Sequence, residues 1–441
     1  MKITTSYAVE ILHPGKQFQR TVEIYRAAVT YLIDVVAKEL ESVFAIAGAK
    51  KQMRIVECLV HRTSKNEPTY DFDSKFYKMP VYLRRAATNA AIGAVSSYRS
   101  NYENWLKSDR KNKPPALPRK CRKMPVFYNA NMYKKTEDDS TVLLKLFDGS
   151  DWKWVPFSVK KTDAKYIQKH CKNKEISAPT LERRYGKYFL RFSFTEKVDL
   201  YNTPIEKQTI CAVDLGLNTG AVCSIMQSDG TILARKFINF PSDKDHLYHV
   251  LNRIKKAQRE HGSHNIGGQW RYARAINKEL SVKIASAIVD FAVLYNCDII
   301  VFEHLDTKGK KISGSKKQKI AMWRKNFIQD IATIKAHQNG MRISRICAWN
   351  TSRLAYDGSG VVCRDPDNHA LATFQNGKHY NCDLSASYNI GARYFIRELL
   401  KPLPVKERSQ VGAKVPDCER RTSCTYNTLL LLVETLAAVV V

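Results

Sequence analysis

Three acidic residues stand at positions where they could bind metal ions. Asp214 follows the apolar run 210–213, Glu303 follows the apolar run 299–302, and Asp383 begins a helical pattern. A carboxylate is costly to bury unless something pairs with it, and a divalent cation is a common partner. Each acid alone also fits a turn or a helix cap, so metal chemistry is indicated only if the three side chains meet.

The elements around these acids predict that they do meet. The runs before Asp214 and Glu303 predict buried strands, and the pattern after Asp383 predicts a helix. Parallel strands end at one edge of an α/β sheet, where the start of a helix can bring a third carboxylate. Clustered carboxylates repel each other unless divalent cations lie between them, as in phosphodiester cleavage by two metal ions. We therefore predict Asp214, Glu303 and Asp383 to be catalytic and to bind two Mg²⁺ ions, for which Mn²⁺ can substitute.

The predicted order of elements in the C-terminal half is that of a ribonuclease-H-like fold. Three strands joined by turns are followed by helices that alternate with two further strands. A Gly/Ser/Lys-rich linker, predicted to be mobile, follows the strand that ends near Glu303. The predicted strands are 210–214, 221–226, 231–240, 298–306 and 341–348, the helices are 243–261, 270–295, 321–339 and 383–400, a joint is 262–268 and the linker is 307–319.

The N-terminal half predicts a small β-barrel interrupted by two helices. Alternating residues predict a strand at 3–12, and apolar residues at three- and four-residue steps predict a helix over 16–47. A second helix is predicted over 80–107, where the leading proline suits the first turn. A basic, proline-bearing connector over 107–123 then leads into β-rich sequence over 126–194.

The net charge of the chain indicates a polyanionic partner. The chain has 72 lysines and arginines against 42 aspartates and glutamates, which gives a formal charge of +30. Such a surplus repels itself in a compact fold, and nucleic acid is the partner that neutralises it most directly. An anionic membrane is the first alternative, although no basic amphipathic helix stands out, and a solvated basic surface is the second.

Cysteine usage and the chain ends favour the cytosol. The chain has 11 cysteines, an odd number with no C-x-x-C pair, which is typical of a reducing compartment and not of a disulfide framework. The N-terminus lacks an apolar signal core. The apolar stretch 429–441 contains Glu434 and is short for a membrane span. This stretch is predicted either to pack as a helix or strand or to form an adhesive tail.

Three segments resemble the motifs of RuvC nuclease domains, in the right order and behind a basic N-terminal half. These segments are Val213–Gly216, Val301–Leu305 and Asp383–Ile390. Thr351 and Ser352 match a T-S pair that stands before a zinc ribbon in one family of nucleases with such domains. Over about residues 1–400, the chain resembles the transposon-encoded TnpB nucleases and their descendants, the miniature type V CRISPR effectors.

This resemblance implies an RNA-guided, metal-dependent DNA endonuclease of the prokaryotic cytosol. The implied partners are a guide RNA and target double-stranded DNA: base pairing selects the sequence, and the protein reads a short flanking motif. One RuvC site would cut the displaced strand and then the target strand. Some members bind one guide as homodimers, so a pair of copies is an open alternative.

The resemblance also implies a division into segments with different roles. These segments are 1–15, the first strand of a wedge β-barrel; 16–120, a helical recognition domain; 121–205, the wedge barrel; 206–349, the first part of the RuvC domain; 350–382, a degenerate zinc-ribbon-like insert that binds target nucleic acid; 383–401, the final RuvC helix; and 402–441, a C-terminal tail.

The chain departs from the family between the second and third motifs. Ala355 and Gly358 stand where the first of two C-x-x-C pairs is expected, and Ser385 replaces the usual asparagine. The nearby donors are spaced loosely for tetrahedral zinc. These donors are Cys363, His369, His379 and Cys382. We therefore expect no zinc, and a knuckle held by hydrogen bonds and the turn 357–360.

Basic and aromatic residues, most of them in the N-terminal half, are candidates for nucleic-acid contacts. A solvated face explains them equally well, and aromatic residues in a barrel are more often part of its core. The candidates are Arg84, Arg85, Tyr98, Arg99, Lys120, Arg122, Lys123, Lys160, Lys161 and Arg324.

Other functions compete with guided cleavage. An RNA-guided DNA-binding repressor without cleavage would have lost an acid of the triad, and all three acids are present. A guide-independent ribonuclease-H-like nuclease or recombinase would leave the N-terminal half without a role. In the plainest alternative, the three acids are unrelated caps and turn residues.

Overall fold

The computed structural model describes residues 1–110, 112–138, 140–262, 266–304 and 322–440. The chain folds as two compact units, an N-terminal unit (Lys2–Lys197) and a C-terminal unit (Met1 and Val198–Val441). The linker predicted at 307–319 lies outside the described residues, as do parts of the joint at 262–268, the strand at 298–306 and the helix at 321–339.

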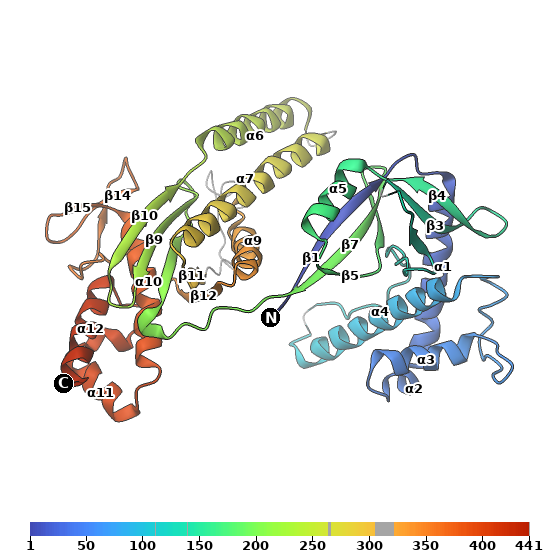
Figure 1. Cartoon of the computed structure of the whole chain (residues 1–441), viewed down its shortest axis with the longest axis horizontal. Helices are drawn as coiled ribbons and strands as arrows, with labels where there is room; N and C mark the ends of the chain where they lie inside the picture. The colour runs from blue at the N-terminus through green and yellow to red at the C-terminus, as the bar shows by residue number, and fades with distance from the viewer. Residues whose placement is uncertain (111, 139, 263–265, 305–321, 441) are drawn as a thin grey trace. The chain divides into compact units, whose positions relative to one another are not determined.

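The N-terminal unit combines helices with two antiparallel sheets (Figure 1). One sheet has the order β1-β7-β5, with β6 also paired to β7, and the other has the order β2-β3-β4. The strands are β1 (Lys2–Ile11), β2 (Tyr133–Lys135), β3 (Thr141–Phe147), β4 (Trp152–Ser158), β5 (Glu175–Ile176), β6 (Thr180–Arg184) and β7 (Lys187–Lys197). The helices are α1 (Lys16–Lys38), α2 (Leu40–Phe44), α3 (Ala49–Val60), α4 (Val81–Lys107) and α5 (Lys161–His170).

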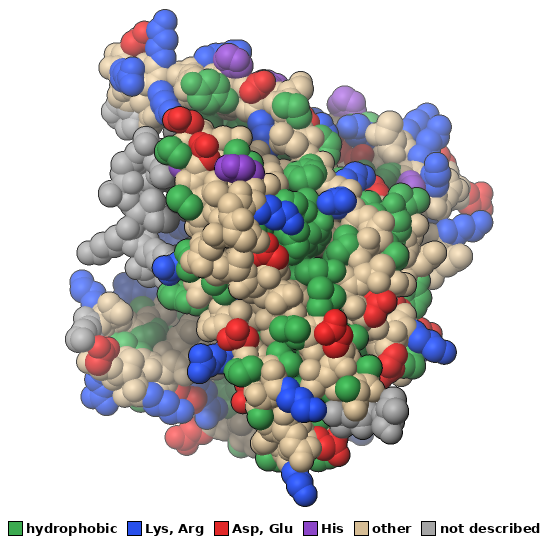
Figure 2. Space-filling view, turned by 90° about the vertical axis from the view of Figure 1, so that its left-hand side faces the viewer, with side chains coloured by type: hydrophobic (Ala, Val, Ile, Leu, Met, Phe, Trp, Pro, Cys, Tyr) green, Lys and Arg blue, Asp and Glu red, His purple; other side chains and the backbone are tan. Residues whose placement is uncertain are grey.

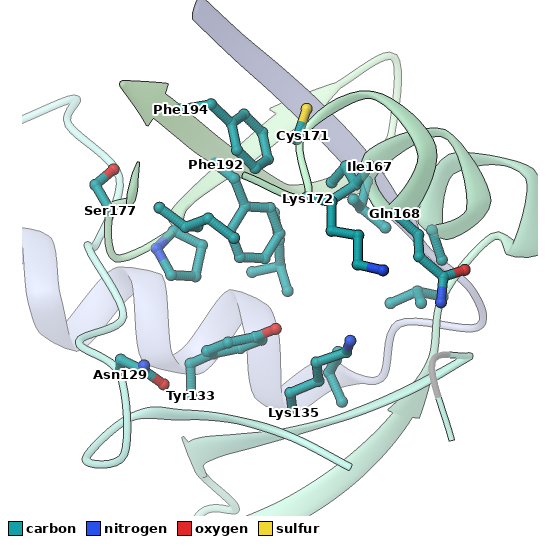
Figure 3. Close-up of a pocket in the computed structure, with 17 residues that line it drawn as sticks. Asn129, Tyr133, Lys135, Ile167, Gln168, Cys171, Lys172, Ser177, Phe192 and Phe194 are labelled. Atoms are coloured by element: carbon teal, nitrogen blue, oxygen red, sulfur yellow. The ribbon is translucent and has the colours of Figure 1, made fainter. Parts of the chain in front are cut away.

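Among the described residues the predicted wedge barrel does not close, because its strands form two separate sheets. β2 has three residues and β5 has two, too few to continue a hydrogen-bonded ladder around a barrel. An isolated bridge joins Ile11 to Val159 where the sheets approach each other. Elsewhere they line a cavity of about 480 Å³, to which α5 also contributes (Figure 3).

The helix predicted over 16–47 is interrupted. α1 ends at Lys38, the short α2 follows, and Gly48 adopts a φ of 109° before α3 begins. This φ is strained for any residue with a Cβ, so glycine permits the change of direction there. The helices α3 and α5 are additional to the prediction. α5 lies within sequence whose aromatic content favoured strands.

The C-terminal unit is built on a five-stranded sheet of order β10-β9-β8-β11-β12 (Figure 1). β8, β11 and β12 are parallel, whereas β9 and β10 run antiparallel to their neighbours. α7 and α9 cover one face of this sheet and α10 covers the other. The predicted order of strands and helices in this half is confirmed. The elements are β8 (Thr209–Asp214), β9 (Ala221–Gln227), β10 (Ile232–Ile238), α6 (Pro241–His261), α7 (Gly267–Leu294), β11 (Ile299–His304), α9 (Lys325–Gln338), β12 (Arg342–Cys347) and α10 (Cys382–Leu400).

The last described helix, α12 (Tyr426–Val440), packs on α10. Leu429 and Leu432 are fully buried in the core that α10 forms with the sheet, which accounts for the apolar stretch 429–441. No described helix has the length and apolar character needed to cross a membrane. The remaining elements are η1 (Ile205–Lys207), a small sheet of β13 (Cys363–Arg364), β14 (Leu371–Thr373) and β15 (His379–Asn381), then α11 (Val405–Lys414), η2 (Pro416–Glu419) and α12 (Tyr426–Val440).

Candidate functional site

Alternation along two neighbouring strands places Asp214 and Glu303 on the same face of the sheet. Val213 pairs with Phe302 in the parallel ladder between β8 and β11. Asp214 and Glu303 each stand one residue further along these strands, so they lie side by side. Ala212 lies in the core on the α10 side, whereas Val213 and Phe302 lie in the core on the α7 side. Because side chains alternate between the faces of a strand, both acids point toward the α10 side.

Asp383 reaches the same edge of the sheet from the first turn of α10. Asn381 caps this helix, because its side-chain oxygen accepts a hydrogen bond from the Leu384 amide at 2.9 Å. The cap fixes the start of the helix, and α10 packs along β8, β9 and β11. The fold therefore brings the three predicted acids into one region.

The charges of the other two acids both act on Asp214. Burial raises the pKa of Asp214, and the negative charges of Glu303 and Asp383 raise it further. Burial also raises the pKa of Glu303 and of Asp383. The charge of Arg364 opposes the pKa shifts of Asp214 and Asp383. Because burial raises the pKa of all three carboxyl groups and neighbouring charges raise that of Asp214 further, a bound cation would stabilise their ionised forms.

Glu303 is held in place from two sides. The residue is 7% exposed, and its carboxylate accepts a hydrogen bond from the Thr351 hydroxyl. This bond and the nearby Arg393 guanidinium lower the pKa of Glu303, in opposition to burial. From the α9 side, the Gln329 amide donates to the main-chain oxygen of Glu303 at 3.0 Å. These contacts orient the carboxylate toward α10.

The loop that carries Thr351 is itself fixed by α10. The Asn389 side-chain amide donates to the carbonyl oxygens of Thr351 and Leu354, both at 2.9 Å. The Ser385 hydroxyl accepts a hydrogen bond from the Tyr356 amide at 3.1 Å. One helix therefore both carries Asp383 and positions the loop that orients Glu303.

Two arginines of this region were missing from the sequence prediction. Arg393 is 5% exposed and lies in an otherwise apolar part of α10, and that isolated charge was the available signal. Arg364 belongs to β13 and comes near Asp214 and Asp383 only through the fold of the insert. Nothing in the local sequence marks Arg364.

The donor set fits Mg²⁺ in chemistry, because three carboxylates supply the hard oxygen ligands that this ion prefers. In the part of the chain that the structure describes, however, no three His, Cys, Asp or Glu side chains are grouped closely enough to hold one metal ion. The acids interact electrostatically without forming a single coordination shell. If two ions share the three acids, fewer carboxylates need to converge on each ion.

The segment predicted as a degenerate zinc ribbon contains a small apolar core. The turn predicted there is present: Asp357 accepts hydrogen bonds from the Ser359 amide at 3.1 Å and the Asn376 amide at 3.0 Å. Of the possible zinc donors, Cys363 is exposed and Cys382 is buried. The absence of zinc stays a prediction. The buried core consists of Ala355, Ala372, Phe374 and Cys382.

Two of the predicted nucleic-acid contacts are engaged within the N-terminal unit. Arg84 is 5% exposed, and its Nη1 lies 3.0 Å from His61 Nδ1 and 3.7 Å from an Asp73 oxygen. Arg85 pairs with Glu57 at 3.0 Å. Both arginines therefore help to hold the start of α4 against the preceding segment.

The other predicted contacts lie nearer the surface, and nucleic-acid binding by them stays a prediction. On the face that Figure 2 shows, lysines and arginines are interspersed with acidic and apolar side chains and do not gather in one patch. Lys120, Arg122 and Lys161 are exposed. Those with a protein neighbour are Tyr98 beside Tyr102, Arg99 with Glu103, Lys123 with the Ala90 carbonyl, Lys160 near Glu10, and Arg324 over Phe327.

Without divalent cations, the C-terminal unit should lose stability as the pH rises above the ordinary carboxyl pKa of about 4. Because the pKa values of Asp214, Glu303 and Asp383 are raised in the fold, the folded state there binds more protons than the unfolded state. The free energy of unfolding therefore falls as the pH rises through that window. Mg²⁺ binds ionised carboxylates, so it should stabilise the unit more at about pH 8 than at about pH 5.

Protection of α10 peptides against hydrogen exchange at both pH values, with EDTA or with excess MgCl₂, measures this difference in the C-terminal unit. Asp214→Asn should reduce both the stabilisation by Mg²⁺ and its dependence on pH. Equal stabilisation of the native chain by Mg²⁺ at the two pH values would contradict the expected coupling.

Sequence comparison finds similarity in the N-terminal part of the chain. Residues 5–148 match the model of the Aq_aa04 family. A protein of Aquifex aeolicus (strain VF5) named "Uncharacterized protein aq_aa04" is 28% identical over 142 residues, which cover 29% of this chain and 82% of that protein. The three acids lie outside the residues 5–148 that match the family model.

Similar solved structures span both units of the chain. A Cas12f1–sgRNA–target DNA complex is 16% identical with a TM-score of 0.33, and covers 88% of this chain and 98% of that one. CasPhi-2 (Cas12j) bound to crRNA is 8% identical with a TM-score of 0.47, and covers 88% and 97%. The mini-RNA-guided endonuclease CRISPR-Cas_phi3 is 10% identical with a TM-score of 0.47, and covers 88% and 92%. TM-scores below 0.5 do not establish a shared fold, so the functional case rests on the site itself.

Proposed function

We propose that this chain is an RNA-guided, metal-dependent DNA endonuclease that cuts double-stranded DNA beside a short flanking motif. One observation carries the nuclease part: Asp214 and Glu303 follow a paired level of neighbouring parallel strands, and Asp383 lies in the first turn of the helix that packs on them. The formal charge of +30 supports a nucleic-acid partner. The resemblance of three segments to RuvC motifs supports a guide RNA and target DNA as the partners.

In this proposal the three acids hold two Mg²⁺ ions. When bound, such ions lower the pKa of an attacking water and stabilise the leaving oxygen of a phosphodiester. The hydroxyl of Thr351 orients the Glu303 carboxylate, which keeps its oxygens directed to the site. Arg364 is exposed beside Asp214 and Asp383, where its guanidinium can bind a phosphate of the strand to be cut.

Two competing functions differ from this proposal in what they require. A DNA-binding repressor without cleavage needs no cluster of coupled acids, so the retained triad counts against it. A guide-independent nuclease or recombinase needs the triad but no guide. Only the guided endonuclease requires both a bound RNA of defined structure and an active acid cluster.

The RNA that accompanies the protein tests the guided part. The chain should be purified from cells that express its native locus, and the bound RNA should be sequenced. We expect one discrete species with a structured scaffold and a variable end, and the variable end will show whether a CRISPR array or a transposon end supplies the guide. The mass of the same complex counts the copies of the chain per guide. Random RNA, or none, would leave only the metal-dependent nuclease.

A further inference from the structure

A cavity in the N-terminal unit is separate from the acid cluster. It has a volume of about 480 Å³, within the range of sites that bind small ligands, and it lies between the two sheets beside α5 (Figure 3). Its walls are mainly apolar side chains of the sheets and of α5. None of the residues that line it is acidic. The cavity is therefore suited to a ligand with an apolar body and no positive charge.

Aromatic rings form one wall of the cavity. The rings of Tyr133 and Phe192 contact each other edge to face with their centres 5.6 Å apart, and Phe194 follows along the same strand. In Figure 3 the Tyr133 hydroxyl points into the open space. Flat heteroaromatic ligands stack well against such surfaces, as bases do in nucleic-acid complexes.

Polar groups lie at two ends of the same cavity. Figure 3 shows the Asn129 amide and the Ser177 hydroxyl at one end. At the other end, the side chains of Lys135 and Lys172 direct their ammonium groups toward the open space, with Gln168 nearby. Amides present both donors and acceptors, which match the edge of a nucleobase, and paired ammonium groups favour a phosphate.

We propose that this cavity binds one nucleotide, with its base against Tyr133 and Phe192 and its phosphate at Lys135 and Lys172. A fatty acid would satisfy the lysines but would make no use of the Tyr133 and Phe192 rings as a stacking surface, so the aromatic wall favours a base. The nucleotide is either free or unstacked from a bound strand. The strand as its source rests on the proposed function, whereas the nucleotide site rests on the cavity alone.

Two substitutions test the site in the full chain. Ala164 lies on α5 and lines the cavity, so Ala164→Leu should fill the space for the base and lower affinity at least tenfold, while leucine keeps a strong helix preference. Lys172→Ala should weaken binding about fivefold, as expected for a partly solvated charge pair. Lys169→Ala, an exposed lysine of α5 that does not line the cavity, is the matched control and should leave affinity unchanged.

Calorimetric titration with AMP measures the site, with adenosine and decanoate as comparisons. We expect saturable AMP binding, weaker binding of adenosine, and none of decanoate. A nucleic-acid strand that carries 2-aminopurine shows where the nucleotide comes from, because the fluorescence of this base rises when it unstacks. A rise that Ala164→Leu abolishes identifies a base unstacked from the strand. AMP binding without that rise identifies a free nucleotide. Absent AMP binding, preference for decanoate, or AMP binding unaffected by Ala164→Leu overturns the proposal. If the chain purified from cells that express its native locus carries no defined RNA but binds AMP, the guided function is refuted and the nucleotide site stands.

Discussion

Asp214→Asn is expected to lower DNA cleavage on the order of 10³-fold or more. Metal ions at such a site supply several kcal/mol of transition-state stabilisation, and each 1.36 kcal/mol corresponds to a factor of ten in rate. Asparagine keeps the shape of the side chain and removes the charge that the ions need. Guide and target binding should persist, because the substitution leaves the basic surfaces unchanged.

Cleavage of a guide-matched duplex and gel-shift binding to the same duplex measure the two effects. Burial and neighbouring acids raise the pKa of Asp214, so its ionised form destabilises the metal-free fold at neutral pH. In EDTA, α10 of the variant should therefore be protected against hydrogen exchange at least as well as in the native chain. Asp245→Asn, an exposed aspartate of α6, is the matched control and should cut normally. A D214N chain that still cuts at the native rate would refute the site.

The acid cluster was predictable because strands and helices impose simple rules. Apolar runs that end in Asp214 and Glu303 indicate buried strands, and parallel strands end at a common edge. The side on which these acids lie follows from the alternation of neighbours such as Val213. Each of these inferences depends on local sequence and on a fold rule, not on distant contacts.

The parts that escaped prediction depend on contacts between distant segments. The two sheets of the N-terminal unit could close into a barrel only if their strands were long enough and α5 did not lie beside them. The alternation of residues within each strand does not encode either condition. Thr351 acts on Glu303 only because Asn389 holds its loop. Arg364 nears Asp214 only because β13 folds back there. Residue types at these positions carry no local periodicity from which such contacts could be inferred.

Arg393→Met is expected to destabilise the C-terminal unit by about 3–5 kcal/mol, the range for leaving buried polar partners unmatched. Arg393 donates to four main-chain carbonyls and holds three segments together. Its partners are Trp349 at 2.7 Å, Cys347 at 2.9 Å, Cys424 at 3.0 Å and Thr422 at 3.2 Å. Methionine fills much of the volume and satisfies none of these oxygens, and it also removes the charge that lowers the pKa of Glu303.

Because the chain has two units, a single melting curve does not isolate this effect, whereas hydrogen exchange of peptides from α10 and α12 reports the C-terminal unit alone. Arg397→Met, one turn further along α10, is the matched control. That side chain is 42% exposed, and it pairs with Glu398 at 2.8 Å and donates to Ser344 Oγ at 2.8 Å and to the Arg345 carbonyl at 3.2 Å. Because water can replace these exposed contacts, its loss should cost less than the loss of Arg393. Equal protection of α10 and α12 against hydrogen exchange in the two variants would contradict this prediction. It would show that the four carbonyls find other partners and that Arg393 does not hold together the segments around Glu303.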